Sequence, residues 1–276
     1  MTDIADWQGG VGRNWAAEWQ RTDATFSELT PHLLAAIASE PGKRIVDIGC
    51  GAGEMAMAVA AARPDAQVIG VDVSPDLVVA ARLRSSQAAI LTFQLGDASF
   101  WTDPAGAPDL YVSRHGVMFF ADPPSAFAHL AASAAHNARL VFSCFRTAAD
   151  NGWAAAIAEL LPKSETPRAQ PFAPGPFAFA EPEHVRICLR GWRDIVFAPI
   201  DFAYVAGTGP DAITEAMALF HRIGPAASAL RTLPSGEREA FEQRLLALVE
   251  AQHDGVRVAF PGAAWLVSAT SDHFDG

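Results

Sequence analysis

The stretch Val46-Asp47-Ile48-Gly49-Cys50-Gly51-Ala52-Gly53-Glu54 decides the fold of this chain. It joins a β-rich apolar run at Arg44–Ile48 to an alanine-rich run at Glu54–Ala62, so it predicts a strand that turns directly into a helix. Three glycines within five residues let a ligand approach the backbone of that turn closely. The alternative is a tight turn without a ligand.

The same alternation of strand and helix continues on the C-terminal side of this loop. Because strands joined by helices at this spacing need right-handed crossovers, the pattern predicts an α/β fold with a parallel sheet. Ser74-Pro75 is a helix start, with Ser as N-cap and Pro in the first turn. The predicted strands are Arg44–Ile48, Gln67–Asp72, Ile90–Leu95, Asp109–Ser113 and Arg139–Phe145, and the predicted helices are Glu54–Ala62, Pro75–Ser85 and Ser125–Ala135.

The character of the chain changes after residue 150. Six prolines between 162 and 182 predict a surface loop, followed by a short helix at Glu183–Arg190. Two further strands are predicted at Asp194–Tyr204 and Ala263–Thr270. The segment 205–262 between them is far longer than a hairpin loop and holds two helical patterns. We expect a lid over a site, or an oligomerisation arm that would make a homodimer.

Composition excludes several classes of protein. The chain has 276 residues, of which 50% are hydrophobic and 18% charged, with a net charge of −11, so it can fold around a core without disulfides or metals. Two lysines and scattered arginines argue against a nucleic-acid partner, which needs clustered positive charge. No apolar run approaches the roughly 18 to 20 residues that span a bilayer, and no targeting signal opens the chain. We expect a cytoplasmic protein.

The glycine loop favours a ligand with a cationic or zwitterionic end. Dinucleotide sites use G-x-G-x-x-G and place a pyrophosphate at the helix N-terminus. Here the spacing is G-x-G-x-G and the next position is Glu54, whose carboxylate suits the helix dipole but would repel a phosphate. Asp47 adds a second negative charge. An NAD-binding oxidoreductase is therefore the less favoured interpretation.

Two more aspartates end the next two predicted strands. Asp72, in Val71-Asp72-Val73, can accept hydrogen bonds from both hydroxyls of a ribose. Asp97, in Gly96-Asp97-Ala98, can accept one from an exocyclic amine such as that of adenine. Each alone is explained as well by a turn or a helix cap. Together with the loop they lie at the carboxyl ends of successive parallel strands, where open α/β sheets bind ligands.

These motifs resemble those of class I S-adenosylmethionine (SAM) dependent methyltransferases, small-molecule type, similar to the ubiquinone and menaquinone biosynthesis enzymes. The resemblance covers residues 40–150 well. It implies a Rossmann-like, seven-stranded, mostly parallel sheet in the order 3-2-1-4-5-7-6, with strand 7 antiparallel and a helical lid insertion. It also implies SAM as cofactor and S-adenosylhomocysteine as product. The cofactor-binding residues would be Asp47, Gly49, Gly51, Gly53, Asp72, Val73, Asp97, Ala98, Ser113 and Trp15.

The expected organisation is a single methyltransferase domain. It comprises an N-terminal helical segment at 1–38, a cofactor-binding core at 39–204, the lid insertion at 205–262, and a last strand and tail at 263–276. By resemblance, the N-terminal segment folds over the cofactor, and its Trp7 or Trp15 would cover the methionine end. Packing of Trp15 on the core is the alternative.

Methyl transfer from a sulfonium is an in-line displacement in which positioning carries most of the catalysis. His115, just after the fourth strand, is the candidate general base, and a structural histidine is the alternative. Arg114 would hold an anionic acceptor or a neighbouring loop, and Phe119 would line the pocket or join the core. Arg146 and Arg222 are further substrate-binding candidates, for which surface salt bridges are the alternative. The remaining histidines show no ligand spacing, so we predict no metal site.

The predicted function is methylation of a small, apolar or aromatic metabolite at oxygen or carbon. Three alternatives stay open: a SAM-dependent methyltransferase acting on protein or RNA, a SAM-binding protein without catalysis, and the NAD-binding oxidoreductase considered above. The partner is expected to be a small-molecule acceptor.

Overall fold

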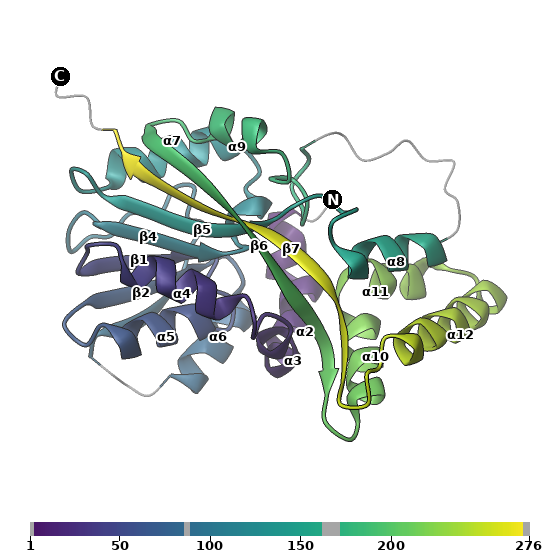
Figure 1. Cartoon of the computed structure of the whole chain (residues 1–276). Helices are drawn as coiled ribbons and strands as arrows, with labels where there is room; N and C mark the ends of the chain where they lie inside the picture. Colours follow the sequence, from purple (N-terminus) through teal and green to yellow (C-terminus); the bar gives the residue numbers. More distant parts are fainter. Residues whose placement is uncertain (1–2, 86–88, 162–171, 273–276) are drawn as a thin grey trace.

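The computed structural model describes residues 3–85, 89–161 and 172–272. Seven strands form one sheet in the order β3-β2-β1-β4-β5-β7-β6, as the sequence predicts (Figure 1). The first five pair in parallel, and β7 runs antiparallel to both β5 and β6. The strands are β1 Arg44–Ile48, β2 Gln67–Asp72, β3 Leu91–Leu95, β4 Leu110–Arg114, β5 Arg139–Phe145, β6 Trp192–Thr208 and β7 Arg257–Ser271.

Helices cover both faces of the sheet, so its central strands are apolar on both sides (Figure 1). One face packs on α4 (Thr30–Ala38), α5 (Glu54–Ala62) and α6 (Pro75–Arg84), and its core takes Ile45 and Val112 from the strands. The opposite face includes α7 (Pro123–Ser133) and α9 (Pro182–Cys188). Its core takes the intervening residues Val46 and Tyr111. This alternation is what a pleated strand buried on both faces requires.

The last two strands are longer than the sequence suggests and carry the insertion beyond the sheet (Figure 1). β6 and β7 remain paired from Trp192↔Ser271 to Thr208↔Arg257, with register shifts at two points. The predicted boundaries of the insertion, 205 and 262, therefore fall inside this long hairpin. The ends of these strands are hard to locate in the sequence, because they contain bulges and extend past the sheet core, where an apolar pattern is not required.

The insertion holds three helices where two were predicted: α10 (Ala212–Arg222), α11 (Gly224–Thr232) and α12 (Ser235–Ala251). Pro225 lies in the first turn of α11 and Gly224 adopts a φ of +81°, so one helix ends and another begins there. The buried residues of α11 are alanines, which give only a weak apolar pattern. Helix α8 (Gly152–Leu160) was likewise not predicted, and much of the expected proline-rich loop (162–171) lies outside the described residues.

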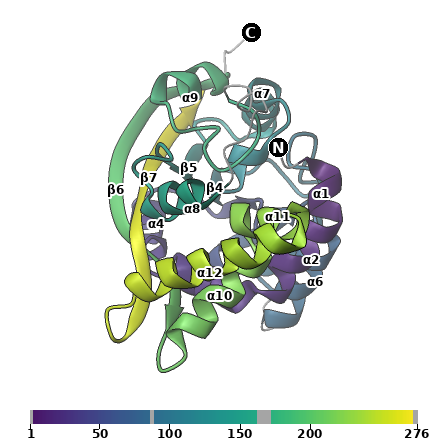
Figure 2. The same cartoon turned by 90° about the vertical axis from the view of Figure 1, so that its right-hand side faces the viewer.

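The N-terminal segment forms α1 (Ile4–Gln8), α2 (Gly10–Ala17) and α3 (Trp19–Thr25). Helix α2 packs on α6, and α3 packs on β6 and α10. Figure 2 shows α1, α2, α10 and α11 gathered at one end of the molecule. Two ion pairs, Arg21–Glu215 and Arg222–Glu18, join the N-terminal segment to α10. Across the three described ranges, none of the helices has the length and apolarity needed to cross a bilayer.

Candidate functional site

A cavity of about 220 Å³ lies at the carboxyl ends of the central parallel strands. The glycine loop after β1 and the segments after β2, β3 and β4 form its floor. Helices α1 to α3 and the junction of α10 with α11 supply the remaining walls. The N-terminal segment and the insertion are thus both part of the site, because the ends of the strands alone would leave it open to solvent.

The glycine loop brings bare backbone to this cavity. Gly49, Gly51 and Gly53 all have positive φ, at +63°, +53° and +88°. A Cβ on Gly49 would lie 2.9 Å from the Cα of Gly116, so the loop and the segment after β4 touch through backbone. A Cβ on Gly51 would meet nothing within 4 Å. The backbone at Gly51 therefore faces open space, as a loop that receives a ligand should.

Asp72 braces the glycine loop from the end of β2. One of its carboxylate oxygens accepts a hydrogen bond from the Gly51 amide at 2.9 Å, and the other accepts one from the Ser74 amide at 2.8 Å. Burial raises the pKa of this carboxyl, although the backbone hydrogen bonds oppose the shift. Asp72 lines the cavity. It therefore shapes the loop and presents a carboxylate to the same space.

Asp47 is the most unusual group in the cavity wall. Its side chain is 1% exposed, and neither carboxylate oxygen has a hydrogen-bond partner of acceptable geometry. Burial raises its pKa to about 7, while Arg114 and the nearby Ala56 amide oppose the shift. A buried carboxylate without partners is costly, so its presence indicates a missing donor or cation.

Asp97, Val73 and Ala98 also line the cavity. Asp97 is partly exposed, and one of its oxygens accepts a hydrogen bond from the Ser99 amide at 2.8 Å. Ala98 is buried in the core beneath the cavity. The structure thus brings the three aspartates predicted from sequence to one space, each from the end of a different strand.

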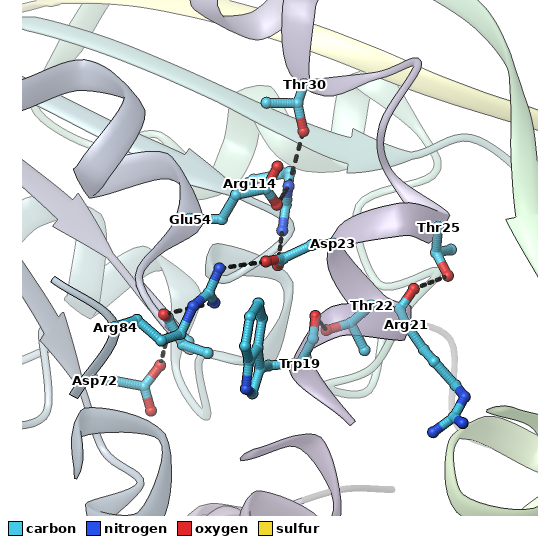
Figure 3. A network of polar contacts seen from close by, with 12 residues as sticks. Trp19, Arg21, Thr22, Asp23, Thr25, Thr30, Glu54, Asp72, Arg84 and Arg114 are labelled. Carbon is cyan, nitrogen blue, oxygen red and sulfur yellow. Dashed lines mark hydrogen bonds and ion pairs between the residues drawn. The ribbon is translucent and has the colours of Figure 1, made fainter. Parts of the chain in front are cut away.

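A polar network ties the N-terminal segment to the glycine loop (Figure 3). Arg114 donates to Thr30 at 2.7 Å and pairs with Glu54, and a second nitrogen lies 3.8 Å from Asp23. The guanidinium of Arg114 is therefore engaged within the protein, which is the second of its two predicted roles. Burial and the nearby Glu54 raise the pKa of the Asp23 carboxyl to about 7.

Arg84 completes this network from α6. It pairs with Asp23, donates to the Ala52 carbonyl at 2.8 Å, and lies 3.7 Å above the ring of Trp19 (Figure 3). One guanidinium thus links α3 to the glycine loop. No motif in the sequence marks Asp23 or Arg84, because only the fold brings these two side chains together.

His115 is buried at the boundary between the glycine loop and the insertion. It adopts a φ of +62°, which is uncommon for a residue with a side chain, and its amide donates to the Ser143 carbonyl at 3.1 Å. The imidazole stacks on Phe145 at 4.1 Å, and its Nε2 has no partner. Burial lowers its pKa to about 3. The ring is therefore neutral at ordinary pH and a weak proton acceptor.

An aromatic wall lines the part of the cavity around His115. We use this name for Phe26, Phe145, Trp153 and Tyr204, which come from the end of α3, β5, α8 and β6. Neighbouring rings in the wall have centroids 4.9 to 6.1 Å apart. None of the four was singled out from the sequence, since aromatic residues in separate elements carry no shared spacing.

The other predicted site residues line the cavity, lie beneath its lining or lie away from it. Trp15 and Phe119 line the cavity, and Trp7 packs between them with centroids 5.6 and 5.0 Å away. Ser113 lies beneath the lining, where its hydroxyl donates to the Ile48 carbonyl at 2.7 Å. Three residues lie outside the lining: Gly53, which packs on Phe93, and the substrate candidates Arg146 and Arg222, whose guanidiniums pair with Asp201 and Glu18.

Neither a metal cluster nor a reactive thiol is found in the described part of the chain. No three His, Cys, Asp or Glu side chains there are grouped to hold an ion. Cys50, Cys144 and Cys188 are buried and unlinked, and burial raises the pKa of each thiol. A protonated, buried thiol is a poor nucleophile, so the carboxylates and aromatic rings are the chemically informative groups of the cavity.

Comparison with known proteins assigns this arrangement to a family. The family described as "Methyltransferase domain" matches residues 19–188. The trans-aconitate 2-methyltransferase of Methylobacterium radiotolerans is 35% identical over 119 residues, which is 43% of this chain and 42% of that protein. The ubiquinone biosynthesis O-methyltransferase of Xanthomonas campestris is 42% identical over 91 residues, covering 33% of this chain and 37% of that one.

The chain thus spans less than half the length of these curated relatives. Among solved structures, the YcgJ protein from Bacillus subtilis superposes with a TM-score of 0.53 at 17% identity, over 88% of this chain and 99% of that one. This last similarity shows a shared fold.

Proposed function

This chain belongs to the methyltransferase domain family, and we propose that it transfers a methyl group from SAM to an oxygen or carbon atom of a small metabolite. The observation that carries the proposal is Asp47, a buried carboxylate without a partner beside a glycine loop that opens onto the cavity. The names of the curated relatives, both small-molecule methyltransferases, support the same assignment.

The residues of the cavity suit SAM as the cofactor. Asp47 would receive the ammonium group of the methionine part, which supplies the donors and charge that its oxygens lack. Asp72 would accept from the ribose hydroxyls and Asp97 from the adenine amine. Val73 and Ala98 would flank the adenine ring, and the open face of Gly51 leaves room for the ligand.

When bound, SAM would supply a methyl group activated on a cationic sulfur: an oxygen lone pair, or the π or carbanion electron pair of a carbon acceptor, would form the new bond while the C–S bonding pair returned to sulfur. The protein's own contribution is to position the acceptor and exclude water. Trp7 and Trp15 of the N-terminal segment and Leu219 and Ile223 of the insertion close the cavity. His115 would hold the acceptor by a hydrogen bond at Nε2.

We propose that His115 positions the acceptor rather than serving as a strong base. Its imidazole is neutral, because burial lowers its pKa to about 3, so it does not keep a proton near neutral pH. A proton lost by the acceptor would therefore pass to solvent. This role needs only the geometry of Nε2 and the stacking on Phe145.

The alternatives find less support in the cavity. A macromolecular substrate would need an open approach, whereas the cavity is walled by α1 to α3 and by the insertion. A diphosphate would meet the carboxylates of Asp47 and Glu54 at the loop, which disfavours NAD. We propose a cytoplasmic protein without a nucleic-acid partner. A homodimer through the insertion stays a prediction, which light scattering would test.

Calorimetric titration with S-adenosylhomocysteine, SAM and NAD tests the proposal. We expect the first two to bind and NAD not to bind; binding of NAD alone would overturn the assignment. Asp72→Asn should weaken S-adenosylhomocysteine about tenfold or more, since it removes a charged hydrogen-bond acceptor worth about 1.5 to 3 kcal/mol. Because Asp72 also holds the Gly51 amide, Asp97→Asn provides a second variant, and the exposed Asp65→Asn is the matched control.

A further inference from the structure

We call the part of the cavity beside His115 and the aromatic wall its acceptor end, and aromatic side chains form most of its lining. The aromatic wall presents Phe26, Phe145, Trp153 and Tyr204 to it, and Trp153 stacks on Tyr204 with centroids 4.9 Å apart and planes 19° from parallel. Leu219, Ile223 and Pro225 of the insertion also line the cavity. Flat rings and aliphatic side chains favour a flat, apolar ligand, because stacking adds to the gain from area burial.

Part of this end lies outside the residues that match the family, although Phe26, Phe145 and Trp153 lie within them. Tyr204, Leu219 and Ile223 all lie beyond residues 19–188, the part that matches the family. They reach the cavity because the long β6–β7 hairpin carries the insertion back over the ends of the strands. The substrate of a relative therefore says little about what this end accepts.

The described lining of the cavity offers an anionic acceptor no free cationic side chain. Of the described residues that line it, Arg114 is the only arginine or lysine, whereas five carry carboxyl groups: Asp23, Asp47, Glu54, Asp72 and Asp97. Arg114 is already paired with Glu54 and lies 3.8 Å from Asp23, so its positive charge is balanced by carboxylates of the cavity wall. A carboxylate on the acceptor would lose its water and gain no arginine or lysine partner from the described lining.

Two buried ring nitrogens mark where a polar group of the acceptor would bind. His115 Nε2 and Trp153 Nε1 have no hydrogen-bond partner, and their residues are more than nine-tenths buried. Both residues line the cavity. A single hydroxyl or carbonyl on an otherwise apolar ligand would satisfy such a group, because neutral polar groups bury at little cost once they are hydrogen-bonded.

We infer that the methyl acceptor is an uncharged molecule with a planar aromatic ring and a polar substituent, and that polycarboxylates are excluded. This inference rests on the proposed function, since it takes the glycine-loop half of the cavity to hold SAM. It separates this chain from the trans-aconitate 2-methyltransferases, whose named substrate is a polycarboxylate.

The test compares two probes that share a ring and differ in charge. Protein saturated with S-adenosylhomocysteine is titrated calorimetrically with 2-naphthol, with 2-naphthoate and with trans-aconitate. We expect 2-naphthol to bind about tenfold or more tightly than 2-naphthoate, because burying a carboxylate without a cationic partner costs at least that much. Equal or tighter binding of either anion, or no binding of 2-naphthol, overturns the inference. Failure of S-adenosylhomocysteine itself to bind overturns the proposed function instead.

Two substitutions make the test specific to these residues. Tyr204→Leu should weaken 2-naphthol about threefold to tenfold by removing a ring from the wall, and Tyr204→Phe should not. Glu54→Gln should improve 2-naphthoate binding and leave 2-naphthol unchanged, because it frees the charge of Arg114. Each variant's affinity for S-adenosylhomocysteine reports whether the cavity is intact. Unchanged discrimination in Glu54→Gln would contradict the charge argument.

Discussion

Replacing Asp47 by asparagine should make the protein more stable and a poorer binder of its cofactor. Burial raises the pKa of this carboxyl from its ordinary 3.8 to about 7. At about 1.36 kcal/mol per pKa unit, its ionisation costs about 4 kcal/mol more in the folded protein than in the unfolded chain. Asparagine escapes that cost but leaves an unpaired amide worth about 1 to 3 kcal/mol. The expected net gain at pH 8 is therefore about 1 to 3 kcal/mol.

The stability difference between the Asp47→Asn variant and the wild type should depend on pH, and its direction follows from the raised pKa of Asp47. Because the folded pKa of Asp47 is raised, its contribution to stability is fully present below pH 4 and is lost as the pH rises from 4 to 7. The asparagine variant lacks this loss. The stability of the variant relative to the wild type should thus increase by about 2 to 3 kcal/mol between pH 5 and pH 8.

Urea unfolding at pH 5 and pH 8 measures the effect, and calorimetry with S-adenosylhomocysteine measures the loss of binding. The matched control is Asp65→Asn, which makes the same chemical change at an exposed position outside the cavity and should show no such pH-dependent gap. A variant that is less stable by the same amount at both pH values would refute the reasoning. It would mean that Asp47 finds a partner within the fold.

Three further changes test the structure around the site. Arg84→Met removes the contacts to Asp23 and to the Ala52 carbonyl, so it should lower the free energy of unfolding in urea by about 3 kcal/mol and weaken the binding of S-adenosylhomocysteine. An unchanged affinity would show that this network does not support the glycine loop. Asn151→Ala should lower the free energy of unfolding by about 3 kcal/mol, because the buried side-chain amide bonds the Thr147 carbonyl and both backbone groups of Ala263. Thermal unfolding measures this loss, and an unchanged melting temperature would contradict the prediction. Arg222→Ala removes an exposed arginine from the buried Glu18, which keeps its second partner Arg21, and should change the free energy of unfolding by less than about 1 kcal/mol. A larger loss would show that this contact holds the insertion closed.

The cofactor half of the cavity was predictable because its residues are close in sequence or follow a regular rule. Asp47 and the glycines belong to one loop, and Asp72 and Asp97 end the next two strands. Parallel strands deliver their carboxyl ends to one edge, so the strand pattern alone places these residues together. The sheet order, including the reversed last strand, was implied by the family resemblance and is confirmed.

The acceptor half was not predictable in this way. Phe26, Phe145, Trp153 and Tyr204 come from four elements with no shared spacing, and α8, which carries Trp153, was missed altogether. Arg146 and Arg222 were proposed for this half because arginine suits anions, yet both lie outside the lining. Their guanidinium groups pair with Asp201 and Glu18, and the sequence does not predict such pairings because the partners are distant along the chain.

Periodicity and glycine spacing act over a few neighbouring residues, so the sequence predicts the parallel strands and the place of the cofactor site, whereas the order of the strands is implied by the family resemblance. Only the tertiary structure decided what the cavity excludes. Asp23 and Arg84 are 61 residues apart, and Arg114 and Glu54 are 60 apart. Folding alone brings these charges together and pairs the arginine of the cavity wall, so in the function we propose the aromatic rings select the acceptor.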